Sequence, residues 1–193
     1  MSSALAVETT ILHRRSIKPA QMNGNKIQDD LVDHLLEMAN WAPTHGLTEP
    51  WFYLVFSGEK VQEFCFQHAQ LYKNSTPSEK YTEAAYEKIL HNGDKASHIL
   101  AAIMKRGDNQ KIPEQEEMAS VAASIQNILL TATAHGIASF WSTSGMTYQQ
   151  AMKDFLQLRP QDKLMGFIFL GYSDLPFTDG KRMKSHAEKS KWA

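Results

Sequence analysis

The chain has 193 residues, of which 42% are hydrophobic and 21% are charged, and its formal net charge is −1. This composition is typical of one globular domain, and the balanced charge gives no general attraction to nucleic acid or to an anionic membrane, so we expect neither as a partner. The single cysteine, Cys65, excludes an intrachain disulfide and a cysteine-based zinc cluster. The first residues lack a signal-peptide pattern and no stretch approaches the ~18 apolar residues of a membrane span, so we expect a cytoplasmic protein.

The first half of the chain contains four predicted helices and one predicted strand. The spacing of apolar residues indicates a loose helix over 5–14 and a clearer one over 27–41, with Asn25 as its N-cap. The aromatic and β-branched run WFYLVF at 51–56 predicts a buried strand. Two more helical patterns follow, over 60–73 and 79–90.

The second half alternates strands with helices. The apolar run at 98–104 favours a strand, although a helix also fits, and the alanine-rich pattern over 116–134 predicts a central helix in the core or at a subunit interface. Further patterns predict a strand over 137–141, a helix over 148–157 and a strand over 164–172. This alternation indicates an α+β or α/β domain with a mixed central sheet, of which we take α+β. We expect one domain over 1–193, with a polar tail from about residue 174.

Four polar side chains lie at the end of the first predicted helix and just after it, in the stretch HRRSIKP. They are Arg14, Arg15, Ser16 and Lys18. Guanidinium groups beside a hydroxyl suit a phosphate or a carboxylate, because a planar fork gives charge-assisted bonds with fixed geometry. Alternatively, the arginines complement the negative end of the helix dipole, which is worth only ~0.3–1 kcal/mol. Taken alone, this segment favours the helix-end interpretation.

Two other segments place polar or aromatic side chains at the end of a predicted element. The loop WAPTHGLTEPW is rich in rigid and small residues, so Trp41 or His45 could line a flat ligand, while an ordinary connection fits equally well. In FWSTSG, Trp141 is most simply a core residue. Ser142 and Thr143 could bond a ligand or cap the next helix, and capping is the commoner use.

The sequence offers little support for a catalytic side chain or a metal site. Cys65 is flanked by aromatic residues, which is typical of an inert core thiol. The histidines show no HExxH spacing, and there is no Walker loop, GxGxxG or GxSxG. We therefore expect no metal and no catalytic acid, base or nucleophile, and any redox chemistry would come from an organic cofactor.

Taken in order, four motifs resemble the nitroreductase family of FMN-dependent oxidoreductases, most closely its small single-domain members. They are RRSIK, APTHGLTEPW, SFWSTSG and DKLMGFIFLGY, and the resemblance covers roughly 8–172. It implies a nitroreductase-like α+β fold with a mixed central sheet surrounded by helices, and a homodimer whose flavin sites are completed by both subunits. It also implies hydride transfer from NAD(P)H to FMN and on to an electron-poor acceptor such as a nitroaromatic or a quinone. The alternative is an FMN-binding or flavin-processing relative without general turnover.

The resemblance also assigns roles to individual residues. Arg14 and Ser16 match positions that hold the FMN phosphate and ribityl chain, with Arg15 beside them. Lys18 matches a position at the flavin N1/O2 edge, where a cation stabilises the negative charge of the reduced ring. The other matching positions are flavin contacts at Trp41, His45, Trp141, Ser142 and Thr143, and a second phosphate contact at Lys181 and Arg182.

The chain departs from the family pattern at two places. Leu47 and Glu49 stand where many members have asparagine and glutamine, and the segment 141–143 lacks an arginine that small members often carry. The first departure bears on contacts to the pyrimidine edge, and the second on contacts to a pyridine nucleotide or phosphate. The resemblance therefore supports FMN binding more strongly than turnover with NAD(P)H.

Overall fold

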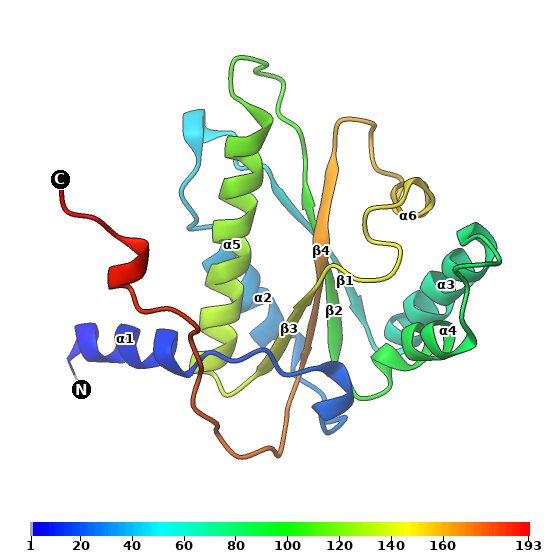
Figure 1. Ribbon diagram of the computed structural model, residues 1–193, viewed down its shortest axis with the longest axis horizontal. Helices are drawn as coiled ribbons and strands as arrows, with labels where there is room; N and C mark the ends of the chain where they lie inside the picture. The colour runs from blue at the N-terminus through cyan, green and yellow to red at the C-terminus, as the bar shows by residue number, and fades with distance from the viewer. Residues whose placement is uncertain (1) are drawn as a thin grey trace.

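A four-stranded antiparallel sheet forms the centre of the protein (Figure 1). The computed structural model describes residues 2–193. The strands lie in the order β1-β2-β4-β3, and every neighbouring pair is antiparallel. Their bounds are Trp51–Ser57 for β1, His98–Met104 for β2, Ala138–Ser142 for β3 and Lys163–Gly171 for β4.

The α+β class is confirmed, while the expected mixed sheet differs in detail. Among residues 2–193 the parallel pairing is confined to an isolated bridge between Ser16 and Ser139, at the edge of β3. Apolar periodicity identifies the residues of a strand, but it carries no information on the direction of the neighbouring strand. The apolar pattern therefore does not distinguish a mixed sheet from an antiparallel one.

Helices cover both faces of the sheet (Figure 1). α2 and α5 pack on one face, and α3 and α6 pack on the other, each pair with its own hydrophobic cluster. α4 packs against α3, and α1 lies against α5 at the edge of the molecule. The helix bounds are Ser3–His13 for α1, Asp29–Ala39 for α2, Glu59–Ser75 for α3, Glu83–Leu90 for α4, Glu114–Ala134 for α5 and Gln150–Phe155 for α6.

Strand β2 shows why the sheet is a buried layer. Leu100 and Met104 join the cluster on the α2 and α5 face, while Ile99 and Ile103 join the cluster on the opposite face. Successive side chains of a strand point to opposite faces, so a strand covered on both sides is apolar throughout. All seven residues of β2 are buried, and the strand predicted at 98–104 is confirmed.

The start of α2 differs from the prediction. The helix begins at Asp29 behind Gln28, so the prediction of Asn25 as its N-cap is wrong. The backbone N–H of Ile27 donates to the Ser97 hydroxyl at 2.7 Å, and Ile27 is itself buried in the core. This hydrogen bond to Ser97, the residue before β2, holds the segment extended. The helix therefore begins about one turn later than predicted.

The alanine-rich helix α5 lies in the core, as predicted. Val121, Ile125, Ile128 and Ala132 are fully buried on its sheet-facing side. Although α5 is 21 residues long, no helix among residues 2–193 combines the length and the apolar character that a bilayer crossing requires.

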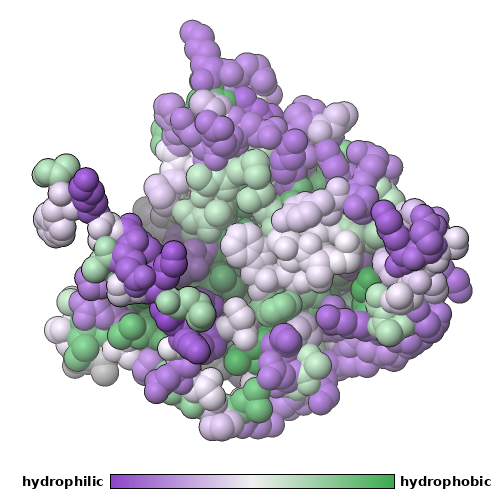
Figure 2. Space-filling model, viewed as in Figure 1, coloured by the Kyte–Doolittle hydropathy of each residue, from purple (hydrophilic) through white to green (hydrophobic). Residues whose placement is uncertain are grey.

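Helix α1, in contrast, has no buried residue. Its apolar side chains Leu5, Val7, Ile11 and Leu12 are each exposed by half or more. Figure 2 shows hydrophobic atoms gathered at the lower left of the molecule, where α1 lies in Figure 1. An exposed apolar surface of this kind is typical of a protein interface.

Candidate functional site

One cavity collects side chains from two of the three candidate segments. It measures about 540 Å³, within the range of small-molecule sites. Lys18 lines it from the segment before η1 (Pro19–Gln21), and Trp141, Ser142 and Thr143 line it from the end of β3. We call this part of the protein the cavity corner. The rest of the lining comes from Pro19, Ala20, Lys88, His91, Asn92, Phe140 and Ser144.

Hydrogen bonds bring these two segments together and fix the wall. The Ile17 backbone N–H donates to the Ser139 carbonyl at 3.0 Å, which holds the segment of Lys18 beside β3. The Trp141 indole N–H donates to the Met165 carbonyl at 2.9 Å, so the ring lies across the edge of the sheet. Trp141 is 36% exposed, so it is not the simple core residue that its sequence suggests.

Gly166 allows Trp141 to adopt this position. A Cβ atom at Gly166 would stand 2.6 Å from the Trp141 indole nitrogen and 2.6 Å from the Ser142 carbonyl. Its φ of +130° lies in a region that L side chains rarely adopt. The register between β2 and β4 shifts beside this residue, as at a β-bulge. The aromatic wall of the cavity therefore depends on a glycine on the neighbouring strand.

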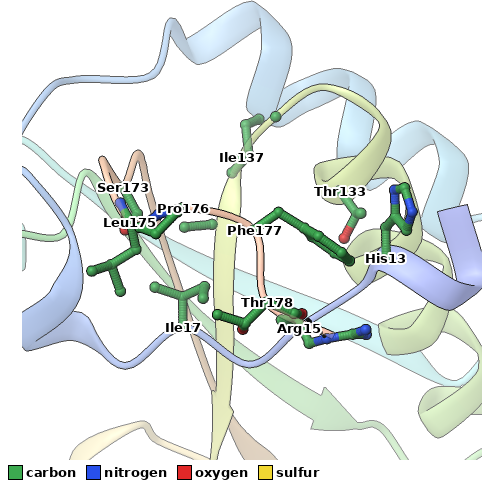
Figure 3. Close-up of a pocket in the computed structure, with 12 residues that line it drawn as sticks. His13, Arg15, Ile17, Thr133, Ile137, Ser173, Leu175, Pro176, Phe177 and Thr178 are labelled. Carbon is green, nitrogen blue, oxygen red and sulfur yellow. Dashed lines mark hydrogen bonds between the residues drawn. The ribbon is translucent and has the colours of Figure 1, made fainter. Parts of the chain in front are cut away.

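The basic segment contributes two differently placed arginines. The Arg15 guanidinium donates to the carbonyls of Thr178, Leu12 and Arg14 at 2.6–2.9 Å, and it lies 5.4 Å from the centre of the Phe177 ring (Figure 3). Arg15 thus anchors the tail to the end of α1. Within residues 2–193 the Arg14 guanidinium has no such hydrogen bond or ion pair, so Arg14 is the arginine that is free to hold an anion.

The structure does not bring the tail cations to the cavity. Lys181 and Arg182 lie in the exposed segment after β4, and neither lines the cavity of Lys18. The Arg182 guanidinium donates to the Lys181 carbonyl at 3.1 Å. Their expected contact with a phosphate stays a prediction.

The third candidate segment lies elsewhere. The His45 imidazole contacts the Glu116 carboxylate near the start of α5, with Nδ1 and Oε2 2.5 Å apart, beside a separate cavity of about 310 Å³. Trp41 is 79% exposed. Leu47 and Glu49 have φ values of +54° and +42°, in the left-handed region that costs a residue with a side chain roughly 1–3 kcal/mol. We call the loop that contains these four residues the loop corner.

Lys18 and the loop corner lie at diagonally opposite places on the sheet. Ser139, whose carbonyl holds the segment of Lys18, pairs with Leu170, which pairs with His98 at one end of β2. Trp51, which follows the loop corner, pairs with Met104 at the other end of β2. Six residue steps along β2 correspond to roughly 20 Å, and three strand spacings between β1 and β3 to roughly 14 Å. One chain therefore does not bring Trp41 and His45 to Lys18.

Comparison with known proteins shows the family and the fold of this chain. A family model described as the nitroreductase family matches residues 11–172. The chain belongs to the nitroreductase family. An Escherichia coli (strain K12) relative named "Putative NAD(P)H nitroreductase YdjA" is 24% identical over 144 residues, which are 75% of this chain and 76% of the relative.

Solved structures of nitroreductases share the fold. A nitroreductase-like family protein from Bacillus cereus has a TM-score of 0.82 and 22% identity, covering 100% of this chain and 98% of its own. The FMN-dependent nitroreductase NfnB from Mycobacterium smegmatis, in complex with NADPH, has a TM-score of 0.71 and 18% identity, covering 100% of both chains. The predicted family and fold are confirmed, and the protein is an oxidoreductase of the nitroreductase type.

Sequence reasoning missed the second wall of this nitroreductase's cavity. Lys88 belongs to α4, and His91 and Asn92 belong to η3 (His91–Gly93). His91 lies between the carboxylates of Asp94 at 2.9 Å and Glu87 at 3.2 Å, and its hydrogen bond to Asp94 is the main cause of its raised pKa. The spacing of 88, 91 and 92 places all three on one helical face, which is the signal that could have found them.

His68 is a second residue that the sequence did not assign. It lies on α3 and is 7% exposed, and its Nε2 accepts a hydrogen bond from the Met146 backbone N–H at 3.0 Å. Burial lowers the pKa of His68 to about 4, so the ring is neutral at pH 7 and keeps this acceptor. Gly145 has φ of +68°, and a Cβ there would stand 2.6 Å from Nε2. His68 thus fixes the turn that follows Ser142 and Thr143.

Proposed function

We propose that this nitroreductase binds FMN at the cavity corner, takes hydride from NAD(P)H and delivers electrons to an electron-poor acceptor such as a nitroaromatic or a quinone. The observation that carries the proposal is that Lys18, Trp141, Ser142 and Thr143, from segments far apart in the sequence, line one cavity. Membership of the family and the names of YdjA and NfnB support it. The cytoplasmic location stays a prediction.

The side chains present fit FMN. An indole, hydroxyl groups and an ammonium suit a flat ring with polar edges, and the partner-free guanidinium of Arg14 suits a phosphate. The buried side-chain N or O atom that lacks a hydrogen-bond partner in residues 2–193 is the Ser139 hydroxyl, directly at the bridge to Ser16. FMN, when bound, supplies the two-electron chemistry that no side chain here can perform.

The roles of the protein side chains in this proposal are electrostatic and geometric. The ammonium of Lys18 favours a negative charge in the cavity, and Arg14 and Ser16 hold the phosphate group. Trp141 and the turn fixed by His68 orient the flat ligand. No side chain is required as an acid, base or nucleophile, because proximity and orientation of the two reactants account for most of the acceleration.

We propose further that the working form is a homodimer. Trp41 and His45 can join Lys18 in one site only if the loop corner of a second copy reaches the cavity corner of the first, because the two corners of one chain lie apart. The exposed apolar side chains of α1 and the half-buried small residues of α5 offer a surface for this contact.

A second candidate function is FMN binding or flavin processing without general nitroreductase turnover. The observation that favours it is the loop corner, where Leu47 is 83% exposed and Glu49 places a carboxylate in a position that many family members fill with an amide. The segment 141–143 also lacks an arginine. The first feature bears on contacts to the pyrimidine edge of the flavin, and the second on contacts to a pyridine nucleotide or a phosphate.

An absorbance spectrum followed by steady-state kinetics separates these candidates. We expect the purified protein to show a flavin band, or to gain one with FMN and much less with riboflavin, since the arginine needs the phosphate. NADH or NADPH oxidation with a nitroarene or a quinone then supports the first candidate. A flavin band without turnover supports the second, and no flavin band after incubation with excess FMN contradicts both.

A further inference from the structure

We propose that the wall formed by α4 and η3 is an anion subsite in which Lys88 binds a carboxylate or phosphate group of the molecule that reacts in the cavity. This inference rests on the proposed function, because it assigns a substrate class to the same cavity. It concerns the part of the lining that comes from α4 and η3, to which neither the motifs nor the proposed cofactor contacts give a role.

The charge of the cavity lining points to an anionic ligand. Three basic side chains line it, Lys18, Lys88 and His91, and no aspartate or glutamate is part of the lining. The lysines that form ion pairs in residues 2–193 are Lys60, Lys105 and Lys163. The ammonium groups of Lys18 and Lys88 therefore lack a carboxylate partner in the described part of the chain. A bound anion would form a charge-assisted interaction with these positive charges.

The acidic residues nearby are engaged elsewhere. Glu87 and Asp94 flank the same wall, and both carboxylates contact the imidazole of His91, one at each ring nitrogen. With both ring nitrogens committed to carboxylates, His91 does not donate to a ligand. When the His91 ring is protonated, its positive charge offsets one of the two negative charges of Glu87 and Asp94. Lys88 is thus the cation on this wall that can bind an anion directly.

The wall is held in place by packing. α4 begins at the Thr82 cap, whose hydroxyl accepts from the Ala85 N–H at 3.3 Å, and its Ile89 side chain is buried. η3 packs against η1, the element next to Lys18. Gly93 leaves no room for a side chain, since a Cβ there would stand 2.9 Å from the Cys65 sulfur. Lys88 and Asn92 are four residues apart and face the cavity, and packing fixes the positions of the elements that carry them.

The anion could be carried by the hydride donor or by the acceptor, and two ligand pairs separate these sources. NADP⁺ differs from NAD⁺ by one phosphate, and 4-nitrobenzoate differs from 4-nitrobenzyl alcohol by its carboxylate. None of the four exchanges electrons with an oxidised flavin, so dissociation constants can be measured without turnover, from changes in flavin absorbance or by calorimetry. The flavin band of each sample reports separately that the proposed cofactor is bound.

The decisive variant is Lys88→Gln, with Lys95→Gln as a matched control. Lys95 is exposed, lies seven positions further on and does not line the cavity, so its replacement makes the same change in net charge. We expect Lys88→Gln to weaken, in one pair, the member with the additional anionic group by about tenfold, as for loss of one charge-assisted hydrogen bond, and to leave the other member unchanged. Lys95→Gln should behave as the parent.

The pair that responds identifies the source of the anion. Loss of the preference for NADP⁺ assigns the subsite to the hydride donor, and loss of the preference for 4-nitrobenzoate assigns it to the acceptor. If Lys88→Gln retains its flavin band and binds all four ligands as the parent does, the anion subsite is excluded while the proposed function stands. A parent without FMN would instead overturn the proposed function on which the inference rests.

Discussion

The cavity corner and the loop corner are built in different ways. At the cavity corner, hydrogen bonds tie the Trp141 indole to the Met165 carbonyl and the Met146 N–H to His68, and the backbone conformations with positive φ fall on glycines. At the loop corner, two residues with side chains have positive φ, and Trp41 is 79% exposed. The cavity corner is thus preorganised by contacts within the chain, whereas the loop corner has a strained backbone and an exposed aromatic side chain.

This difference indicates which parts of the site one chain can complete. Strained backbone and exposed apolar side chains persist where the surrounding structure or a partner compensates for them. The loop corner has these properties and lies far from Lys18 in the same chain. Motifs that together resemble one flavin site therefore lie at two separate places on each chain.

The largest effect should come from replacing the glycine at the turn of the cavity corner. Gly145→Ala adds left-handed strain and a Cβ 2.6 Å from the His68 Nε2, whereas Gly136→Ala has nearly the same φ, +69°, with open space around it. We expect a loss in the free energy of unfolding of roughly 3 kcal/mol for Gly145→Ala and roughly 1 kcal/mol for Gly136→Ala. Urea denaturation measures both.

FMN titration of the same two variants shows whether the turn matters for the cofactor. Only Gly145→Ala should weaken FMN, because only this turn lies along the cavity. Equal stability losses together with equal FMN affinities would show that the wall is not preorganised by His68.

Removing the partner-free guanidinium should affect FMN more than folding. Arg14→Ala loses a charge-assisted phosphate contact, which we expect to weaken FMN by roughly 1.5–3 kcal/mol, about ten- to a hundredfold. Arg14→Lys keeps the charge but loses the planar fork, so its affinity should be intermediate. Fluorescence titration of the apoprotein measures all three. Parent-like binding by Arg14→Ala would remove the phosphate assignment.

His68 should make stability depend on pH. Burial lowers its pKa to about 4, whereas an unfolded histidine has a pKa of about 6.5, so the unfolded state binds more protons between these values. The free energy of unfolding should therefore fall as the pH drops, by about 2 kcal/mol between pH 7.5 and pH 5. His68→Gln keeps an acceptor without titrating and should flatten this slope. An unchanged slope in that variant would assign the pH dependence to other groups.

Lys18→Ala should give the smallest effect, and on a different quantity. The ammonium is exposed, so its interaction with a negatively charged reduced ring is worth about 1 kcal/mol after screening by solvent. This corresponds to a fall of roughly 20–30 mV in the two-electron midpoint potential. A redox titration of the holoprotein measures it. If the potential does not move, Lys18 is a surface residue at the rim of the cavity.

The sequence predicted the parts of this protein that depend on local pattern. The strand at 98–104 was predicted with its observed bounds, because a buried strand is a short apolar run between polar residues. Lys18 and Trp141 were both proposed as site residues, because each follows or ends a regular element in a motif of the family. The structure places them in one cavity.

The parts that the sequence did not predict depend on packing between distant elements. His68 and Lys88 belong to no motif: His68 accepts from the Met146 backbone N–H in the turn that follows β3, and Lys88 lines the cavity from α4. Arg15 and Arg14 look alike in the sequence, but the returning tail engages only Arg15. The separation of Trp41 from Lys18 likewise follows from strand order, which periodicity does not determine.

The proposal that two copies complete each FMN site is tested most directly with purified heterodimers. One chain carries Arg14→Ala, and the other carries Trp41→Ala and His45→Ala, with a different affinity tag on each. In a twofold dimer one site then contains all the changes and the other contains none. We predict about half the flavin of the parent, at an FMN concentration where either altered homodimer binds little. Heterodimers that bind no more FMN than the two homodimers would contradict the account.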